Sequence, residues 1–130
     1  MKLEEIRRVL EAEWLGSTLS LNGYSGMEVR SCHASDLMSD VLTWRGMGSL
    51  LLTGLTNAQV VRVAEVSDFS AVCFVRGKKV QPELVQLAEE RQIPLLASPL
   101  SMFEACGRLY AKGIRGGDTT KENVNCRTRK

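Results

Sequence analysis

The sequence contains few of the features that mark membrane-bound, secreted or metal-binding proteins. No apolar run approaches the ~18 residues that span a bilayer, and residues 1–15 are charged and amphipathic, unlike a signal peptide. The four cysteines form no CxxC pair and only one histidine is present, so the paired ligands typical of a zinc site are missing. With 130 residues, we expect one cytoplasmic domain without a metal, a cofactor or a membrane anchor.

Charge is nearly balanced, and the small excess lies at the carboxyl end. The net charge is +2, and residues 114–130 carry five basic and two acidic side chains with almost no apolar ones. Such a segment buries too little surface to order itself. Residues 1–113 show no basic face for nucleic acid. We therefore expect a folded domain over 1–113, a flexible basic tail over 114–130, and no nucleic-acid partner.

Common catalytic motifs are also missing. The sequence has no GxxxxGK[ST] phosphate-binding loop, no GxGxxG after an expected strand and no GxSxG nucleophile elbow. These absences favour a protein that is not an enzyme.

What the sequence does contain is a regular alternation of short apolar runs and amphipathic segments. Strands are expected over 28–33, 49–53, 71–76 and 93–98, and helices over 2–12, 34–44, 57–68, 82–92 and 101–113. Short, continuous apolar strands between helices are typical of a parallel sheet that is covered on both faces. The predicted fold is an α/β domain with three layers, α/β/α, around a largely parallel central sheet of four to five strands.

Small polar residues follow the expected strands and point to a binding site. In parallel sheets, ligands gather where strands end and helices begin, and free helix amides there attract anions. The same residue types are also favoured at helix starts for structural reasons alone. The candidate ligand-binding residues are His33, Ser35, Asp36, Thr53, Thr56, Asn57, Ser98 and Ser101.

Asp36 and Asp40 are four residues apart, which places both carboxylates on one face of the expected helix. There they could bind a cation, pair with Arg30 or Arg45, or serve acid–base chemistry; alternatively, Asp36 complements the helix dipole and Asp40 is solvated. His33 could act as a base. Its neighbour Cys32 would point to the opposite face of a strand, so a Cys–His pair is not expected.

The order and spacing of these segments resemble the DRTGG domain over about residues 28–114. The most specific pieces are the helix start at residues 35–40, the strand Ala71–Arg76 ending in Gly77, and the strand from Ile93 that runs to Ser98 and Phe103. The resemblance implies an α/β domain related to the amino-terminal, non-catalytic domain of HPr kinase/phosphorylase. It also implies a bacterial regulatory module that forms a homodimer.

Three hypotheses follow. The first is a regulatory module that self-associates and binds a nucleotide or another anionic metabolite at the strand ends. Its apolar candidates for self-association, Met38, Trp44 and Met47, could equally close the core. The second is a subunit that binds a protein partner; stand-alone members that the family implies are encoded beside hydrogenase and NADH-dehydrogenase-like subunits, with signalling regulators nearby. The third is an enzyme that uses Asp36, Asp40 or His33.

Overall fold

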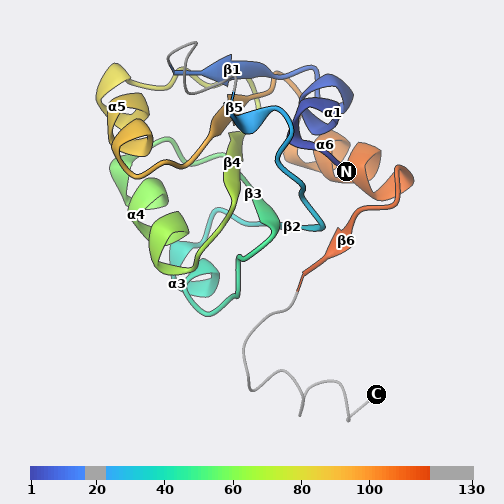
Figure 1. Cartoon of the computed structure of the whole chain (residues 1–130), viewed down its shortest axis with the longest axis horizontal. Coiled ribbons are helices and arrows are strands. Elements are labelled where there is room, and N and C mark those ends of the chain that lie inside the picture. Colours follow the sequence, from blue (N-terminus) through green and yellow to red (C-terminus); the bar gives the residue numbers. More distant parts are fainter. Residues whose placement is uncertain (17–22, 118–130) are drawn as a thin grey trace.

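A computed structural model describes residues 1–16 and 23–117, and its centre is one six-stranded sheet (Figure 1). The strand order is β1-β5-β4-β3-β2-β6, and every neighbouring pair is parallel except β1 with β5. The strands are β1 (Glu13–Leu15), β2 (Ser31–Ala34), β3 (Ser49–Thr53), β4 (Ala71–Phe74), β5 (Leu95–Ala97) and β6 (Arg115–Gly116).

Helices cover both faces of this sheet, which confirms the predicted three-layer α/β/α class (Figure 1). One layer holds α3 (Met38–Val41), α4 (Ala58–Val66) and α5 (Pro82–Glu90); the other holds α1 (Leu3–Val9) and α6 (Met102–Ala111). The chain steps from β2 to β5 in one direction, so the three crossover helices lie on one face. It then returns from β5 to β6, and this reversal places α6 on the opposite face.

The apolar strands divide their side chains between two cores. Every residue of β3 and β4 is buried, as expected for strands covered on both faces. Alternation along β3 sends Leu51 toward α3, α4 and α5, whereas Leu50 and Leu52 pack with α1 and α6. The sequence boundaries predicted for this strand, 49–53, are correct.

The helix expected over 34–44 is much shorter than predicted. It covers only Met38–Val41, and Leu37 before it has an extended backbone. Asp36 therefore lies outside the helix, and the prediction that Asp36 and Asp40 share one helix face is wrong. The physical reason is that the Asp36 carboxylate bonds to the end of β3, which holds this part of the chain outside the helix.

The carboxyl-terminal boundary also differs from the prediction. Ile114 is buried and Arg115–Gly116 pairs with β2 as β6, so the first residues of the expected tail belong to the folded body. A single apolar side chain and a neighbouring strand edge are sufficient to hold them. Residues 118–130, the rest of the predicted tail, lie outside the described residues.

No helix in the described ranges has both the length and the apolar character to cross a lipid bilayer.

Candidate functional site

At the carboxyl edge of the sheet, Asp36 joins the ends of three strands. Its Oδ1 accepts hydrogen bonds from the Gly54 backbone N–H (2.6 Å) and the Thr53 hydroxyl (3.1 Å), both at the end of β3. Its Oδ2 lies 3.5 Å from a guanidinium nitrogen of Arg76, after β4. Two of the predicted site residues, Asp36 and Thr53, therefore do meet, and their contact stabilises the sheet edge.

Arg76 fills the space above the end of β3. A Cβ placed on Gly54 would lie 2.1 Å from the Arg76 Nη2 atom, so the guanidinium lies directly against the Gly54 backbone. Glycine at this position is what permits the ion pair with Asp36 to reach across β3.

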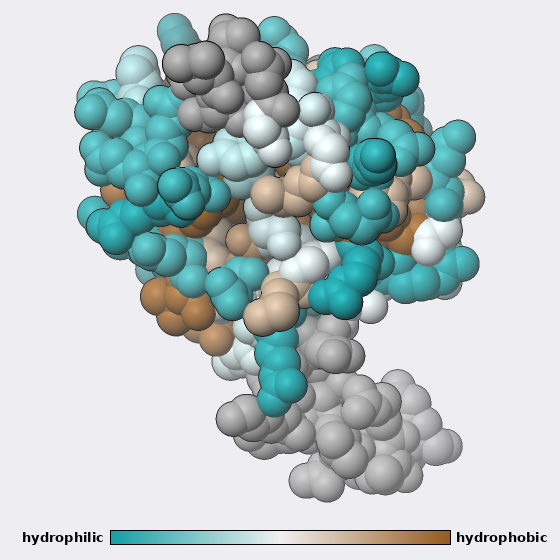
Figure 2. Space-filling view, viewed as in Figure 1, coloured by the Kyte–Doolittle hydropathy of each residue, from teal (hydrophilic) through white to brown (hydrophobic). Residues whose placement is uncertain are grey.

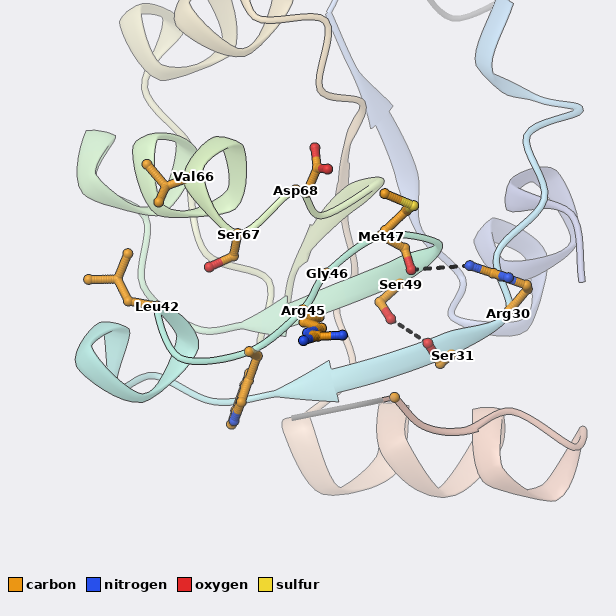
Figure 3. Close-up of a pocket in the computed structure, with 12 residues that line it drawn as sticks. Arg30, Ser31, Leu42, Arg45, Gly46, Met47, Ser49, Val66, Ser67 and Asp68 are labelled. Atoms are coloured by element: carbon orange, nitrogen blue, oxygen red, sulfur yellow. Dashed lines mark hydrogen bonds between the residues drawn. The ribbon is translucent and has the colours of Figure 1, made fainter. Parts of the chain in front are cut away.

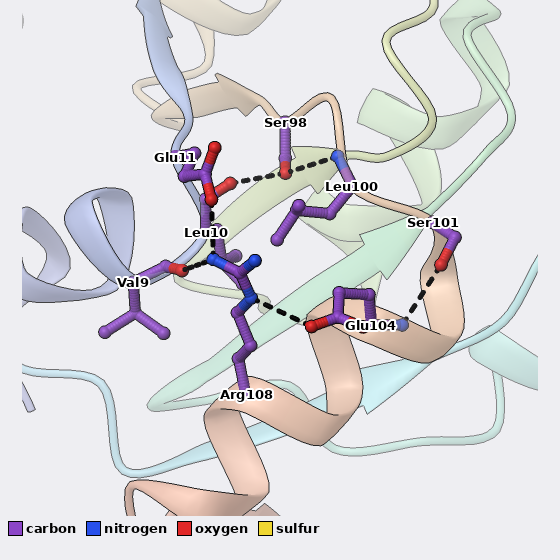
Figure 4. Close-up of polar contacts among 8 residues, drawn as sticks. All are labelled: Val9, Leu10, Glu11, Ser98, Leu100, Ser101, Glu104 and Arg108. Atoms are coloured by element: carbon purple, nitrogen blue, oxygen red, sulfur yellow. Dashed lines mark hydrogen bonds and ion pairs between the residues drawn. The ribbon is translucent and has the colours of Figure 1, made fainter.

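The crevice between β4 and β5 is closed by backbone hydrogen bonds. The Arg76 N–H donates to the Leu100 carbonyl (2.7 Å), and the Gly77 N–H donates to the Ser98 carbonyl (2.9 Å). The buried Ser98 hydroxyl donates to the Leu10 carbonyl (2.6 Å) and accepts from the Leu100 N–H (3.1 Å), as Figure 4 shows. Ser98 thus connects the end of β5 to the end of α1.

The other polar residues predicted at this edge stand near helix starts. The Ser101 hydroxyl caps α6 by accepting from the Glu104 N–H (3.1 Å; Figure 4), and the Ser35 hydroxyl accepts from the Leu37 N–H (2.9 Å). Thr56 and the exposed Asn57 immediately precede α4. These contacts give several of the predicted residues structural roles, and a ligand site at the carboxyl edge stays a prediction.

His33 lies away from that group, in the core between the sheet and α3. Its ring stacks on Trp44 with centroids 4.7 Å apart and meets the edge of Phe69 at 5.6 Å. Cys32 packs in the core on the other face, so the sequence argument that these two neighbours point apart is confirmed. Burial raises the pKa of the Cys32 thiol, which disfavours the thiolate form.

A pocket opens at the opposite, amino edge of the sheet, around the starts of β2 and β3 (Figure 3). Its volume is about 640 Å³, within the range of small-molecule sites. The floor is polar, because the Ser31 and Ser49 hydroxyls are hydrogen-bonded to each other there. Gly117 covers this floor: a Cβ on it would lie within 3 Å of both hydroxyls and of His33 Nε2.

Two arginines give this pocket a positive balance. Among the described residues, Arg30 and Arg45 line it together with a single acidic side chain, Asp68. The Arg30 guanidinium lies against Gly48 and is 3.4 Å from the Met47 carbonyl (Figure 3). Within residues 1–16 and 23–117, no ion pair holds the Arg45 guanidinium, which leaves its charge available to an anion.

The outer wall of the pocket is apolar and exposed. Leu42, Met47 and Val66 have 48%, 67% and 72% of their surfaces accessible. Figure 2 shows hydrophobic atoms gathered beside α3 on a mainly hydrophilic face. Of the residues proposed for self-association from sequence, Met47 is exposed, Trp44 is half-buried in the pocket wall, and Met38 is in the core.

Comparison with known proteins finds similarity in structure only. No model of a known family and no curated protein matches the sequence. A solved structure that does match contains the CBS and DRTGG domains of the regulatory region of a Clostridium perfringens pyrophosphatase, complexed with its activator diadenosine tetraphosphate. The TM-score is 0.62 at 14% identity, over 83% of this chain and 45% of that one. The two chains share a fold.

That neighbour is a regulatory region, and this chain spans less than half of its length. The fold therefore agrees with the one that the DRTGG resemblance implies.

The sequence analysis looked for ligands where parallel strands end, and this rule did not locate the amino-edge pocket. Its signal in the sequence is the segment Arg45–Gly48, in which two glycines flank a methionine between an amphipathic segment and a buried strand.

Proposed function

We propose that this protein is a non-catalytic regulatory module that binds an anionic metabolite of the nucleotide class in the amino-edge pocket. The observation that carries the proposal is that Arg30, Arg45 and Trp44 line one pocket of suitable size. The shared fold with a regulatory region that binds a dinucleotide activator supports it.

The lining supplies each kind of contact that a nucleotide needs. Guanidinium groups bind phosphate through paired, planar hydrogen bonds, and the Arg45 side chain is exposed at the pocket. The Trp44 ring offers flat apolar surface for a base. The Ser31 and Ser49 hydroxyls are hydrogen-bonded to each other under Gly117, so they make the floor of the pocket polar.

The contacts of the candidate catalytic residues also favour a regulatory function. Asp36 is engaged by two hydrogen bonds from β3 and by Arg76, and His33 is packed between two aromatic rings. Side chains engaged in this way stabilise the fold. Asp40 is exposed on a one-turn helix, with no histidine or cysteine cluster around it among the described residues.

Titration with AMP, ATP, diadenosine tetraphosphate and pyrophosphate, followed by calorimetry and thermal unfolding, tests the proposal. A ligand at ~100 times its Kd should stabilise the fold by about 2.7 kcal/mol. We expect Arg45→Gln to weaken binding at least tenfold, whereas the matched change Arg62→Gln, on the exposed side of α4, should leave it unchanged.

A third variant separates the two edges of the sheet. Asp36→Asn should bind as the wild type does if the ligand occupies the amino-edge pocket. Loss of binding in Asp36→Asn together with normal binding in Arg45→Gln would place the site at the carboxyl edge and overturn the proposed location. Absence of binding for every probe would overturn the sensing function itself.

A further inference from the structure

Few contacts hold the two-residue strand β6 on the edge of the sheet. Both of its residues, Arg115 and Gly116, are exposed, and they pair with β2. The buried Ile114 side chain and the contacts of Arg115 with Tyr110 attach this segment to α6. A cleft of about 90 Å³ between β2, β6 and α6 leaves the packing on this side incomplete. A segment with so few buried contacts opens locally at low cost in free energy.

The residue that follows β6 forms part of the amino-edge pocket. Gly117 lines this pocket, and a Cβ added to it would lie 2.7 Å from the Ser31 Oγ and His33 Nε2 atoms and 2.9 Å from the Ser49 Oγ atom. The Gly117 backbone therefore lies directly over the polar floor. Ser31 also pairs with Arg115 in the sheet, so the pocket and β6 share one residue of β2.

We propose that binding of an anion in the amino-edge pocket is linked to docking of β6 on β2, so that occupancy of the pocket controls whether β6 stays paired. This inference rests on the proposed ligand site and concerns how that site is regulated. When β6 is docked, Gly117 closes one wall of the pocket; when β6 detaches, that wall is lost and water reaches the floor. The anion binds the docked form more tightly, and by thermodynamic linkage it strengthens docking by the same factor.

A rigid set of contacts connects Gly117 with the surface proposed to bind the base. The His33 ring under Gly117 stacks on Trp44 and meets the edge of Phe69, and Trp44 lines the pocket. Because this ring is fixed between two aromatic side chains, it cannot turn away from a larger residue at position 117. The weakly held β6 must move instead.

Hydrogen exchange of the full chain with and without saturating ATP, or the tightest-binding of the anions titrated above, tests the linkage. We expect the bound anion to slow exchange of residues 114–117 at least tenfold. Exchange of the exposed residues 78–79, after β4 at the opposite edge, should not change.

Two neighbouring glycines provide a variant and its control. Gly117→Ala should speed exchange of residues 114–117 without any ligand, because the added Cβ displaces β6, and it should weaken anion binding at least tenfold. Gly116→Ala should change neither quantity, since a Cβ there would meet nothing within 4 Å.

A variant outside the pocket excludes a direct effect on the ligand. Ile114 packs in the core with α1 and α6 and does not line the pocket, so Ile114→Ala should weaken anion binding at least threefold by loosening β6 alone. Ile93→Ala removes an equally buried side chain (7% exposed in both) from the other core and should keep the wild-type affinity. Circular dichroism checks that each variant is folded at the assay temperature.

The possible results separate this linkage from the ligand site itself. Unchanged exchange of residues 114–117 on anion binding, or wild-type affinity in both Gly117→Ala and Ile114→Ala, would overturn the linkage and leave the proposed site intact. Absence of binding for every anion would overturn both.

Discussion

A single carboxylate, Asp36, holds the ends of β2, β3 and β4 in place. Its hydrogen bonds to Gly54 and Thr53 satisfy donors at the end of a fully buried strand. The sequence suggested ligand or cation binding, an ion pair with Arg30 or Arg45, acid–base chemistry or a helix-dipole role for Asp36, whereas its ion-pair partner is Arg76. The hydrogen bonds could not be foreseen, because they depend on where β3 ends in space relative to a residue 17 positions earlier in the chain.

Replacing Asp36 therefore tests a stabilising contact. We expect Asp36→Ala to lower the free energy of unfolding by about 1–3 kcal/mol, since it removes the acceptor for the Gly54 N–H. Asp36→Asn keeps an acceptor oxygen and should cost less. Asp40→Ala is the matched control, because Asp40 is exposed; its effect should stay within about 0.5 kcal/mol. Urea unfolding measures all three, and equal losses for Asp36→Ala and Asp40→Ala would contradict the expected role.

Gly46 shows how tightly the pocket wall is packed. A Cβ there would lie 2.5 Å from the Phe69 ring and 2.7 Å from the Phe69 Cα, and backbone cannot move aside as a flexible side chain can. We expect Gly46→Ala to destabilise the fold by about 1–3 kcal/mol. Gly26→Ala, with no atom within 4 Å of the added Cβ, should be close to neutral in the same unfolding measurement. A neutral Gly46→Ala would show that the contact with Phe69 is looser than described.

Among the elements, α1 contains a cluster of one glutamate and two arginines. Glu4 accepts hydrogen bonds from Arg7 (2.6 and 2.9 Å) and from Arg8 (3.0 Å). The hydrogen bond from Arg7, joined by that from Arg8, lowers the pKa of Glu4 to about 2. Because the folded pKa lies below the ordinary value of 4.5, this cluster stabilises the fold above that pH, and the stabilisation is lost as pH falls toward 2.

Unfolding by urea at pH 6 and at pH 3 tests this dependence. We expect the wild type to lose more stability between these two values than Glu4→Gln, which cannot titrate. Glu83→Gln, on α5 and in no ion pair of the described residues, should behave as the wild type does. If Glu4→Gln shows the same acid sensitivity as the wild type, other carboxylates govern it.

The local pattern of apolar residues predicted some helices and strands better than others. β3, α4 and α6 matched closely because apolar residues with a clear period mark them, and burial in the core enforces that period. The helix after β2 was overestimated because Leu37 and Leu42, which completed its apolar face, are exposed. β6 was missed because two residues carry no period at all; pairing with β2 defines it.

For the whole molecule, the alternation of strands and helices was sufficient to predict the fold class, since few topologies satisfy it. The location of the pocket was not predictable in the same way. The general rule directs ligands to the carboxyl edge, yet there the Arg76–Leu100 and Gly77–Ser98 hydrogen bonds draw the loops together. The opening at the amino edge arises instead from the arrangement of Arg30, Arg45 and Gly46 between separate elements.

The sheet ends on both sides in very short strands, β1 with three residues and β6 with two. Edge strands this short offer few unpaired backbone groups to an added strand. Natural proteins use short edge strands to prevent sheets from pairing edge to edge. Growth of the sheet from one molecule into the next is therefore disfavoured. Contact between copies is left to the helical layers, where side chains, and not the backbone, decide which surfaces fit.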